Sequence, residues 1–342
     1  MLYSNTAFFL YLLSKSELIV RTFGIIKPNS LNSGGFMKKA EKKAITELMP
    51  SLGPDDTKVI ITNVEVEKNQ FQIEEYEITD IQSYITKIDD LINNKDYTFF
   101  RGDKSTKEYK LLPKIYSDEY NKCLLNGNTM LTDFTFLSAN KSSINSRLYI
   151  EEMLNAQHYE LPTRLLDWTE SPLVALYFAV SQEKNKENAD SLVWALKPKA
   201  LNNKIPFHKT ISTEGAIYIG SSEKNYDEIV KEYHEQNIPD AYPVAIKTRR
   251  LNPRIEAQNG VFLLFNNNTK NKCLSQYEDA HEYLYKMKIS LKNAEKIYKQ
   301  LIALGITNYS LFPEINSISK DLLNLYNREV SKWVMIILIV LL

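Results

Sequence analysis

The chain has few of the residues on which several protein classes depend. Cysteine occurs twice in 342 residues, at Cys123 and Cys273, and the two positions do not have the spacing of metal ligands. This scarcity argues against a disulfide scaffold or a zinc site and fits a reducing cytoplasm, where thiols stay free. The four histidines are not paired at the spacing with which one helix binds a metal ion. We therefore expect a cytoplasmic protein without a metal site.

Glycine is also scarce, and its positions argue against the common nucleotide-binding loops. None of the ten glycines forms a G-x-G-x-x-G fingerprint or a phosphate-binding G-x-x-x-x-G-K pattern. The sequence likewise has no G-x-S-x-G nucleophile turn and no H-E-x-x-H helix. A Rossmann dehydrogenase and a P-loop nucleotidase are therefore not expected.

Neither sign of charge predominates. Lysine and arginine total 42, as do aspartate and glutamate, so the formal net charge is zero. Such a balance provides no bulk attraction for a polyanion. The densest positive cluster is formed by Lys247, Arg249, Arg250 and Arg254, and it is either a solvated face or a local contact for nucleic acid.

The two ends of the chain are apolar in places but do not predict a membrane protein. Residues 333–342 are ten apolar residues, about half of the ~20 that a bilayer requires. We expect an apolar C-terminal helix over 326–342 that docks on the protein, with membrane attachment as the alternative. Residues 1–36 lack the basic start and cleavage site of a secretory signal and are predicted to be a poorly ordered extension, with Met37 as an alternative start.

Helix and strand signals are both frequent. Helical spacing of apolar residues predicts helices over 81–92, 130–155, 294–304 and 319–326, and a core helix beginning at Pro172. Short apolar or alternating runs predict strands over 97–102, 192–196, 216–219, 242–246, 260–265 and 285–289, with a charged helix between the third and the fourth. Because helices and strands do not alternate regularly, the predicted class is α+β rather than a doubly wound sheet.

One segment combines polar chemistry with a neighbouring core element. Residues 156–169 contain His158, Arg164, Asp167 and Trp168 and lead directly into the apolar helix at Pro172. Pro162 disfavours helical geometry at the residue before it, so the segment is predicted to be a loop that carries His158 and Arg164. Loops held by a rigid scaffold are where binding and catalytic groups concentrate.

Four blocks of the chain, in this order, resemble the FRG domain family, which is named after a Phe-Arg-Gly tripeptide. The blocks are Phe100-Arg101-Gly102, residues 157–169 with the following helix, residues 254–262, and residues 304–306 with 311–313. They place an FRG domain over 78–325, preceded by an accessory segment over 37–77.

The resemblance implies a distant likeness to ADP-ribosyltransferases, which hold NAD against a split, mostly antiparallel sheet. We therefore expect a split mixed or antiparallel sheet flanked by helices, and NAD-dependent ADP-ribosyl transfer or NAD cleavage. FRG-like chains are often met in bacterial defence and toxin settings, and for this chain we expect a nucleic acid or a protein as the acceptor of any ADP-ribose. A non-catalytic module that binds a nucleotide or a partner is one alternative, and a metal-independent RNA nuclease-like toxin is another.

The arginines of the first two blocks are the candidates for holding NAD. An arginine fork suits both pyrophosphate and ribose hydroxyls, and Arg101 and Arg164 are placed for this role by the resemblance. Asp167 is included among the cofactor-binding residues. The structural alternatives are an ion pair for Arg101 and a local pair between Arg164 and Asp167.

Three further residues of the central block are candidates. His158 is suited to proton transfer or to a ribose hydrogen bond, because its ordinary pKa lies near neutrality. Tyr159 and Trp168 are candidates for stacking on the nicotinamide or adenine ring. A structural hydrogen bond for His158 and burial of Trp168 in the core are the alternatives.

The catalytic carboxylate is expected in the third block. ADP-ribosyltransferases use a glutamate to stabilise the positive charge that develops at the anomeric carbon. Glu256 and Gln258 stand two residues apart and share a face if the segment is extended. The usual order places glutamate second, so this pair also leaves nucleic-acid modification, NAD hydrolysis or binding alone open. A turn-stabilising amide is the alternative for Gln258.

Overall fold

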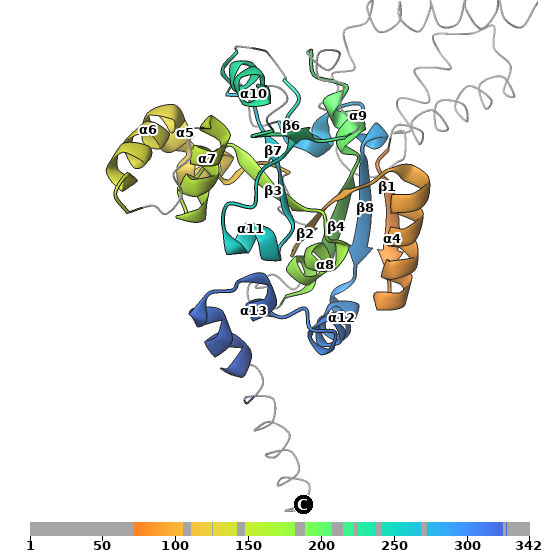
Figure 1. The fold of residues 1–342 in the computed structure, drawn as a ribbon. Helices are drawn as coiled ribbons and strands as arrows, with labels where there is room; N and C mark the ends of the chain where they lie inside the picture. The colour runs from red at the N-terminus through yellow and green to blue at the C-terminus, as the bar shows by residue number, and fades with distance from the viewer. Residues whose placement is uncertain are drawn as a thin grey trace, which may run out of the picture. The chain divides into compact units, whose positions relative to one another are not determined.

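Within the part of the chain that the computed structural model describes, eight strands form one mixed sheet (Figure 1). The strands are β1 (Glu74–Ile78), β2 (Phe99–Asp103), β3 (Leu165–Thr169), β4 (Ser191–Leu196), β5 (Ile217–Tyr218), β6 (Val244–Lys247), β7 (Gly260–Leu264) and β8 (Leu284–Ile289). Their order in the sheet is β1-β8-β4-β2-β3-β7-β6-β5. The outermost pairs, β1 with β8 and β5 with β6, are parallel, and the remaining pairs are antiparallel.

The described residues all belong to the second of two compact units, Lys68–Leu342. They are 72–104, 111–124, 126–141, 148–181, 189–206, 215–221, 225–236, 238, 241–267, 272–323 and 326. The predicted extension over 1–36, nearly all of the accessory segment over 37–77 and the C-terminal helix beyond Tyr326 lie outside them. No helix of the described part is long and apolar enough to span a bilayer.

Helices of very different length accompany the sheet. They are α4 (Ile81–Lys95), α5 (Asn121–Leu124), α6 (Gly127–Ser138), α7 (Tyr149–His158), α8 (Pro172–Val180), α9 (Pro198–Asn202), α10 (Tyr226–Glu235), α11 (Pro253–Ala257), α12 (Leu291–Ala303) and α13 (Asn308–Leu311). Residues 315–323 are also helical. Single 3-10 turns cover Lys114–Tyr116, Asp118–Tyr120, Leu274–Gln276 and Ala280–Glu282.

The sheet is split between β2 and β3. These strands share one residue pair, Phe100 with Thr169, whereas β2 pairs with β4 and β3 pairs with β7 over five residues each. Past this pair the two strands no longer bond to each other. The predicted α+β class and mixed sheet are therefore confirmed.

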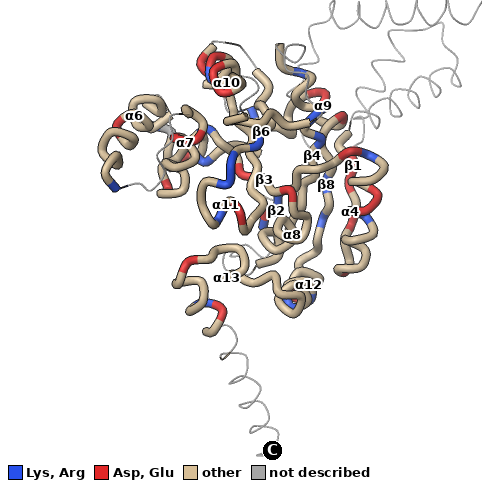
Figure 2. Tube along the Cα trace, viewed as in Figure 1, with Lys and Arg blue, Asp and Glu red and all other residues tan. Residues whose placement is uncertain are grey.

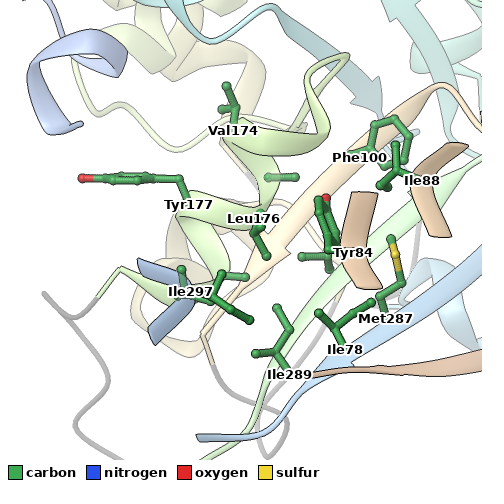
Figure 3. Packing of buried hydrophobic residues seen from close by; sticks show 14 of the residues in the cluster. Ile78, Tyr84, Ile88, Phe100, Val174, Leu176, Tyr177, Met287, Ile289 and Ile297 are labelled. Carbon is green, nitrogen blue, oxygen red and sulfur yellow. The ribbon is translucent and has the colours of Figure 1, made fainter. Parts of the chain in front are cut away.

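Two separate helix layers cover one face of the sheet. Helices α4, α8 and α12 pack on β1, β8, β4 and β2 through a cluster that includes Tyr84, Phe100 and Leu176 (Figure 3). Helices α7, α10 and α11 pack on β3, β7, β6 and β5. Paired residues of neighbouring strands point to the same side, so Phe100 and Thr169 place both layers on one face. The split of the sheet lies between the layers.

The opposite face carries a hydrophobic cluster that continues across the split. It includes Phe99 of β2, Trp168 of β3 and Trp194 of β4, together with Val261 of β7. This cluster holds the two halves of the sheet together, because the ladder of hydrogen bonds between them is nearly absent.

Helix α8 lies directly on β2 at Gly102. A Cβ atom at this position would lie 1.9 Å from the carbonyl oxygen of Ala175 and 2.6 Å from the backbone nitrogen of Ala179. The helix begins with Ser171, whose hydroxyl accepts from the N–H of Val174, and with Pro172 in the first turn. Glycine at 102 is therefore what allows the core helix to approach the strand.

Most predicted elements are confirmed, but the functional blocks differ from their predictions. The helix over 81–92 and the strands over 97–102, 192–196 and 260–265 are found with small shifts at their ends. The loop predicted over 156–169 is wrong, because it contains the end of α7 and strand β3. Strand β3 is only five residues long and forms because it pairs with antiparallel neighbours on both sides. Pro162 lies in the short turn before this strand and does not begin a long loop.

Candidate functional site

A cleft of about 780 Å³ lies at the split of the sheet, on the face that the helices cover. It is lined by residues of β2, β3 and β7, which form its floor, and by residues of α7, α8, α11 and α13, which form its walls. The polar side chains that line it include Arg101, Gln157, His158, Asp167, Arg254 and Gln258. The lining residues Phe100 and Phe312, 212 positions apart in the chain, are thus brought to one cleft, and all four sequence blocks contribute to it.

Asp167 provides a carboxylate at the floor of the cleft. It occupies the middle of β3, where its neighbours Leu166 and Trp168 point to the other face and are buried, while its own side chain is exposed to the cleft. The Gln157 amide nitrogen donates to its Oδ1 at 2.6 Å. Surrounding protein desolvates the side chain even though solvent reaches it through the cleft, and this raises the pKa of the Asp167 carboxyl. The positive charge of Arg101 and the Gln157 hydrogen bond act in the opposite direction.

Arg101 joins the two strands where their ladder ends. Its Nη1 donates to the backbone carbonyl oxygen of Asp167 at 2.6 Å, and its Nε lies 3.4 Å from Oδ2 of Asp103. A side chain from β2 therefore makes a hydrogen bond to β3 beyond the last paired residues. The ion pair that we considered as the alternative for Arg101 is present, and Arg101 is also among the residues that line the cleft.

His158 is the last residue of α7 and lies at the cleft wall. Among the described residues its buried Nδ1 has no hydrogen-bond partner. Burial lowers the pKa of His158, and the nearby Arg254 lowers it further, with Glu314 opposing. The neutral imidazole is therefore favoured at neutral pH, in the form that accepts a proton.

Arg254 and Gln258 connect α11 to the segment after α13. Arg254 donates through Nε and Nη2 to Oε1 of Glu314, at 3.1 and 2.8 Å, and its guanidinium lies over the Phe312 ring at 5.2 Å. The Gln258 amide nitrogen donates to the carbonyl oxygen of Leu311 at 3.1 Å. These contacts fix the wall of the cleft that the fourth sequence block contributes.

Gln258 also has a role in the turn before β7. Its carbonyl oxygen accepts from the hydroxyl of Thr169 at 2.5 Å, and the next residue, Asn259, has a positive φ of 45°. The turn-stabilising interpretation of Gln258 therefore describes its backbone, while its side chain reaches the cleft.

Glu256 lies outside the cleft lining. Residues 253–257 form α11, so the extended segment on which Glu256 and Gln258 would share a face is not present. The Glu256 side chain is 65% exposed, with Nη1 of Arg250 at 3.9 Å. Asn252 caps this short helix and Pro253 begins it, a local start signal that outweighs the strand pattern.

Arg164 and Tyr159 do not line the cleft either. Arg164 is buried and donates to the Tyr116 hydroxyl at 2.8 Å and to the carbonyl oxygen of Leu124 at 3.0 Å. Tyr159 is 55% exposed and its ring lies beside that of Phe134. These contacts are structural, and the pair that we considered between Arg164 and Asp167 is replaced by them.

Trp168 is buried, as the core interpretation predicts. It is 3% exposed and belongs to the hydrophobic cluster on the far face, although part of it also borders the cleft. A stacking role for its ring would require access that the surrounding cluster blocks.

Gln157, Thr163 and the aromatic wall of the cleft were not among the residues predicted from the sequence. The rings of Phe178 in α8 and of Phe312 meet edge to face, with centroids 5.9 Å apart and an interplanar angle of 87°, and both residues line the cleft. Gln157 directly precedes His158 in the central block, and this position is the sequence feature that could have marked it as a site residue. Thr163 contacts Gln157 across the turn, a relation that no spacing rule indicates.

The positive cluster next to α11 is compensated by carboxylates (Figure 2). Lys247 pairs with Glu170, Arg249 with Glu151, Arg250 with Glu256 and Arg254 with Glu314. Each cation has an acidic neighbour within 4 Å, so the cluster provides little net attraction for a polyanion. The interpretation of this run as a solvated face fits these pairs. No group of three or more potential metal ligands occurs among the described residues.

Comparison with known proteins bears on the first two blocks. A family model described as FRG domain matches residues 96–188, which contain the Phe100-Arg101-Gly102 tripeptide, Asp167 and helix α8. No curated protein and no solved structure matches the chain. The matched range contains the two strands at the split, the whole of α7 and the core helix α8, and over residues 96–188 the chain matches the FRG domain family.

Proposed function

We propose that the cleft binds NAD and cleaves the bond between nicotinamide and its ribose, with the ADP-ribose passing to an acceptor or to water. A volume of about 780 Å³ suits a ligand of this size, because ligand pockets commonly span roughly 300–1,000 Å³. The cationic side chains of Arg101, Lys104 and Arg254 line the cleft and suit a pyrophosphate. The rings of Phe178 and Phe312 offer an apolar surface to a base.

The observation that carries the proposal is the exposed carboxylate of Asp167 on the cleft floor. As the nicotinamide leaves with the electron pair of the glycosidic bond, positive charge develops at the anomeric carbon, and a fixed anion stabilises it. Asp103 also lines the cleft but pairs with Arg101. Asp167 has no ion-pair partner within 4 Å among the described residues, and its hydrogen-bond donor Gln157 is neutral. Asp167 therefore takes the role that the sequence analysis gave to Glu256 or Gln258.

His158 is the group suited to activate the acceptor. Its pKa is lowered, so the imidazole is neutral at the pH of a cell and can accept a proton from an attacking hydroxyl group or water. Transfer to a protein or to water fits the compensated positive cluster better than transfer to a nucleic acid does. A role in bacterial defence or toxin action, in the cytoplasm, is part of the same proposal.

A module that binds a nucleotide without turnover is the second candidate. The observation that favours it is that no glutamate occurs among the described residues lining the cleft, and that Gln258 presents a neutral amide there. Binding of NAD with no release of nicotinamide would identify this module.

The test is nicotinamide release from NAD by the purified full chain, with cellular protein, RNA and DNA offered as acceptors. We expect release by the wild type, loss of at least a hundredfold in Asp167→Asn, and retained release in Glu256→Gln. Asp133→Asn is the matched control, because Asp133 is an exposed aspartate of α6 that does not line the cleft. Unchanged release in Asp167→Asn would contradict its assigned role. RNA cleavage without NAD would instead indicate the nuclease alternative.

A further inference from the structure

A directed chain of hydrogen bonds ends on Asp167. The backbone N–H of Leu165 donates to Oγ1 of Thr163 at 3.2 Å, the Thr163 hydroxyl donates to Oε1 of Gln157, and the Gln157 amide nitrogen donates to Oδ1 of Asp167 at 2.6 Å. The two middle members, Thr163 and Gln157, each accept one hydrogen bond and donate the next, so the direction is the same at every step. The chain starts at a backbone amide of β3 and returns to the same strand two residues later.

The polarity of the chain follows from its two ends. A backbone N–H can only donate, and an ionised carboxylate can only accept. The Thr163 hydroxyl must therefore direct its proton to Gln157, and the Gln157 amide must turn its NH₂ group toward Asp167. The opposite orientation would set the amide oxygen against the carboxylate.

The start of the chain is shielded from water. Thr163 and Leu165 are 7% and 3% exposed, whereas the Asp167 side chain is exposed to the cleft. Hydrogen bonds in such a setting are stronger than in water, and successive bonds polarise one another. On the other side of β3, Nη1 of Arg101 donates to the backbone carbonyl oxygen of Asp167 at 2.6 Å. Backbone and carboxylate are thus held by separate contacts.

We propose that Thr163 and Gln157 are positioning residues that fix the orientation of the Asp167 carboxylate in the cleft. The inference rests on the proposed function for the reaction that Asp167 serves, but the hydrogen-bond chain acts on the carboxylate whether or not NAD is cleaved. Neither residue needs to touch the substrate in this role. Loss of either one leaves Asp167 in place with its side chain free to rotate.

A purely structural role is the competing explanation. The turn over 159–164 includes Glu160 with a positive φ of 70°, and Thr163 and Gln157 also brace this turn between α7 and β3. Bracing alone would lower stability when it is lost but would not change the titration of a carboxylate in a folded protein. The titration of Asp167 therefore distinguishes the two roles.

The experiment is a ¹³C carboxyl NMR titration of the full chain labelled at aspartate. The Asp167 resonance is assigned by its disappearance in Asp167→Asn. We expect Asp167 to titrate at higher pH than in the wild type in Gln157→Leu, by a smaller margin in Thr163→Val, and as in the wild type in Thr163→Ser, which restores the hydroxyl.

The charged groups that face Asp167 are unchanged in these variants. Arg101 approaches it from β2 and Arg254 from α11, and the titratable His158, Asp103 and Lys104 also line the cleft. A shift in the titration is therefore due to the hydrogen-bond chain. If Asp167 titrates at the same pH in Gln157→Leu and in Thr163→Val as in the wild type, the positioning proposal is wrong.

Nicotinamide release is the second readout and separates this proposal from the proposed function. We expect kcat to fall at least tenfold in Thr163→Val with KM within about threefold, because the contact acts on the reacting group rather than on binding. Thr163→Ser should recover the lost activity. A shifted titration with no release in any protein, wild type included, would uphold the positioning role and overturn the proposed function.

Discussion

Gly102 tests how the FRG tripeptide builds the cleft. In Gly102→Ala the added methyl group would lie 1.9 Å from the Ala175 carbonyl oxygen and 2.9 Å from its carbonyl carbon, and 2.6 Å from the Ala179 nitrogen. These atoms are backbone atoms of α8, so no side chain can rotate away, and the helix must move from β2. Overpacking a core costs about 1–3 kcal/mol and sometimes more. We expect Gly102→Ala to lower the free energy of unfolding by about 3 kcal/mol, since α8 is buried on nearly all sides.

Two quantities are measured for each variant: the free energy of unfolding in urea and the midpoint of thermal unfolding, Tm. For a unit of this size, about 3 kcal/mol corresponds to a fall in Tm of about 6–12 °C. Gly215→Ala is the matched control, because nothing lies within 4 Å of a Cβ atom there, and its effect should stay within about 0.5 kcal/mol. Equal effects of the two substitutions would refute the argument that the close approach of α8 requires glycine.

Two further predictions concern buried ionisable side chains. Arg249→Ala should destabilise the protein by about 2 kcal/mol, below the usual cost of a wholly buried pair, because it removes the guanidinium that donates to both oxygens of the 0%-exposed Glu151 carboxylate, while Arg249 itself is 58% exposed. Arg250→Ala, at a residue that is 57% exposed, should cost under about 0.5 kcal/mol in the same urea assay, and similar values for the two variants would contradict the reasoning. Burial lowers the pKa of His234 to about 4 from 6.5, so protonation favours the unfolded chain, and stability is lost as pH falls from 6.5 toward 4. Between pH 7 and pH 5 this loss of stability amounts to about 2 kcal/mol. In His234→Gln the free energy of unfolding should not show this loss. An unchanged pH dependence of unfolding in the variant would argue against a neutral buried His234.

The fold could be predicted where the pattern was local and regular. The helix α4 was evident from its apolar spacing, and its Asp80 cap, which closes a capping box with Ser83, agrees with that start. The buried strand β4 was evident from an apolar run between Asp190 and Pro198. Such signals depend on a few neighbouring residues, and tertiary contacts reinforce them here.

The errors lie at the cleft, where tertiary contacts decide local structure. Strand β3 exists because β7 pairs with it over five residues, and that partner lies about 95 positions away in the chain. Helix α11 is five residues long and depends on the Asn252 cap and on contacts with α13 and its following segment. The Asn252-Pro253 start signal is local, but the pairing with β7 and the contacts with the region of α13 are not visible in the local sequence.

The site was predicted in its location more than in its roles. Arg101, His158, Asp167 and Gln258, which the family resemblance assigned to one site, line one cleft. The assignment of the reacting carboxylate to the third block depended on an extended backbone that residues 253–257 do not adopt. Which of several acidic residues faces a cleft is decided by strand register, and register follows from pairing partners that the sequence does not identify.

The account rests on the Asp167 carboxylate as the group that acts on NAD. The most direct test is the rate of nicotinamide release at saturating NAD by the wild type and by Asp167→Asn, with NAD binding measured on both by calorimetry. We expect release by the wild type and its loss in the variant, with NAD still bound by both. Equal release by the two proteins, or no release by the wild type with or without NAD binding, would contradict this role of Asp167.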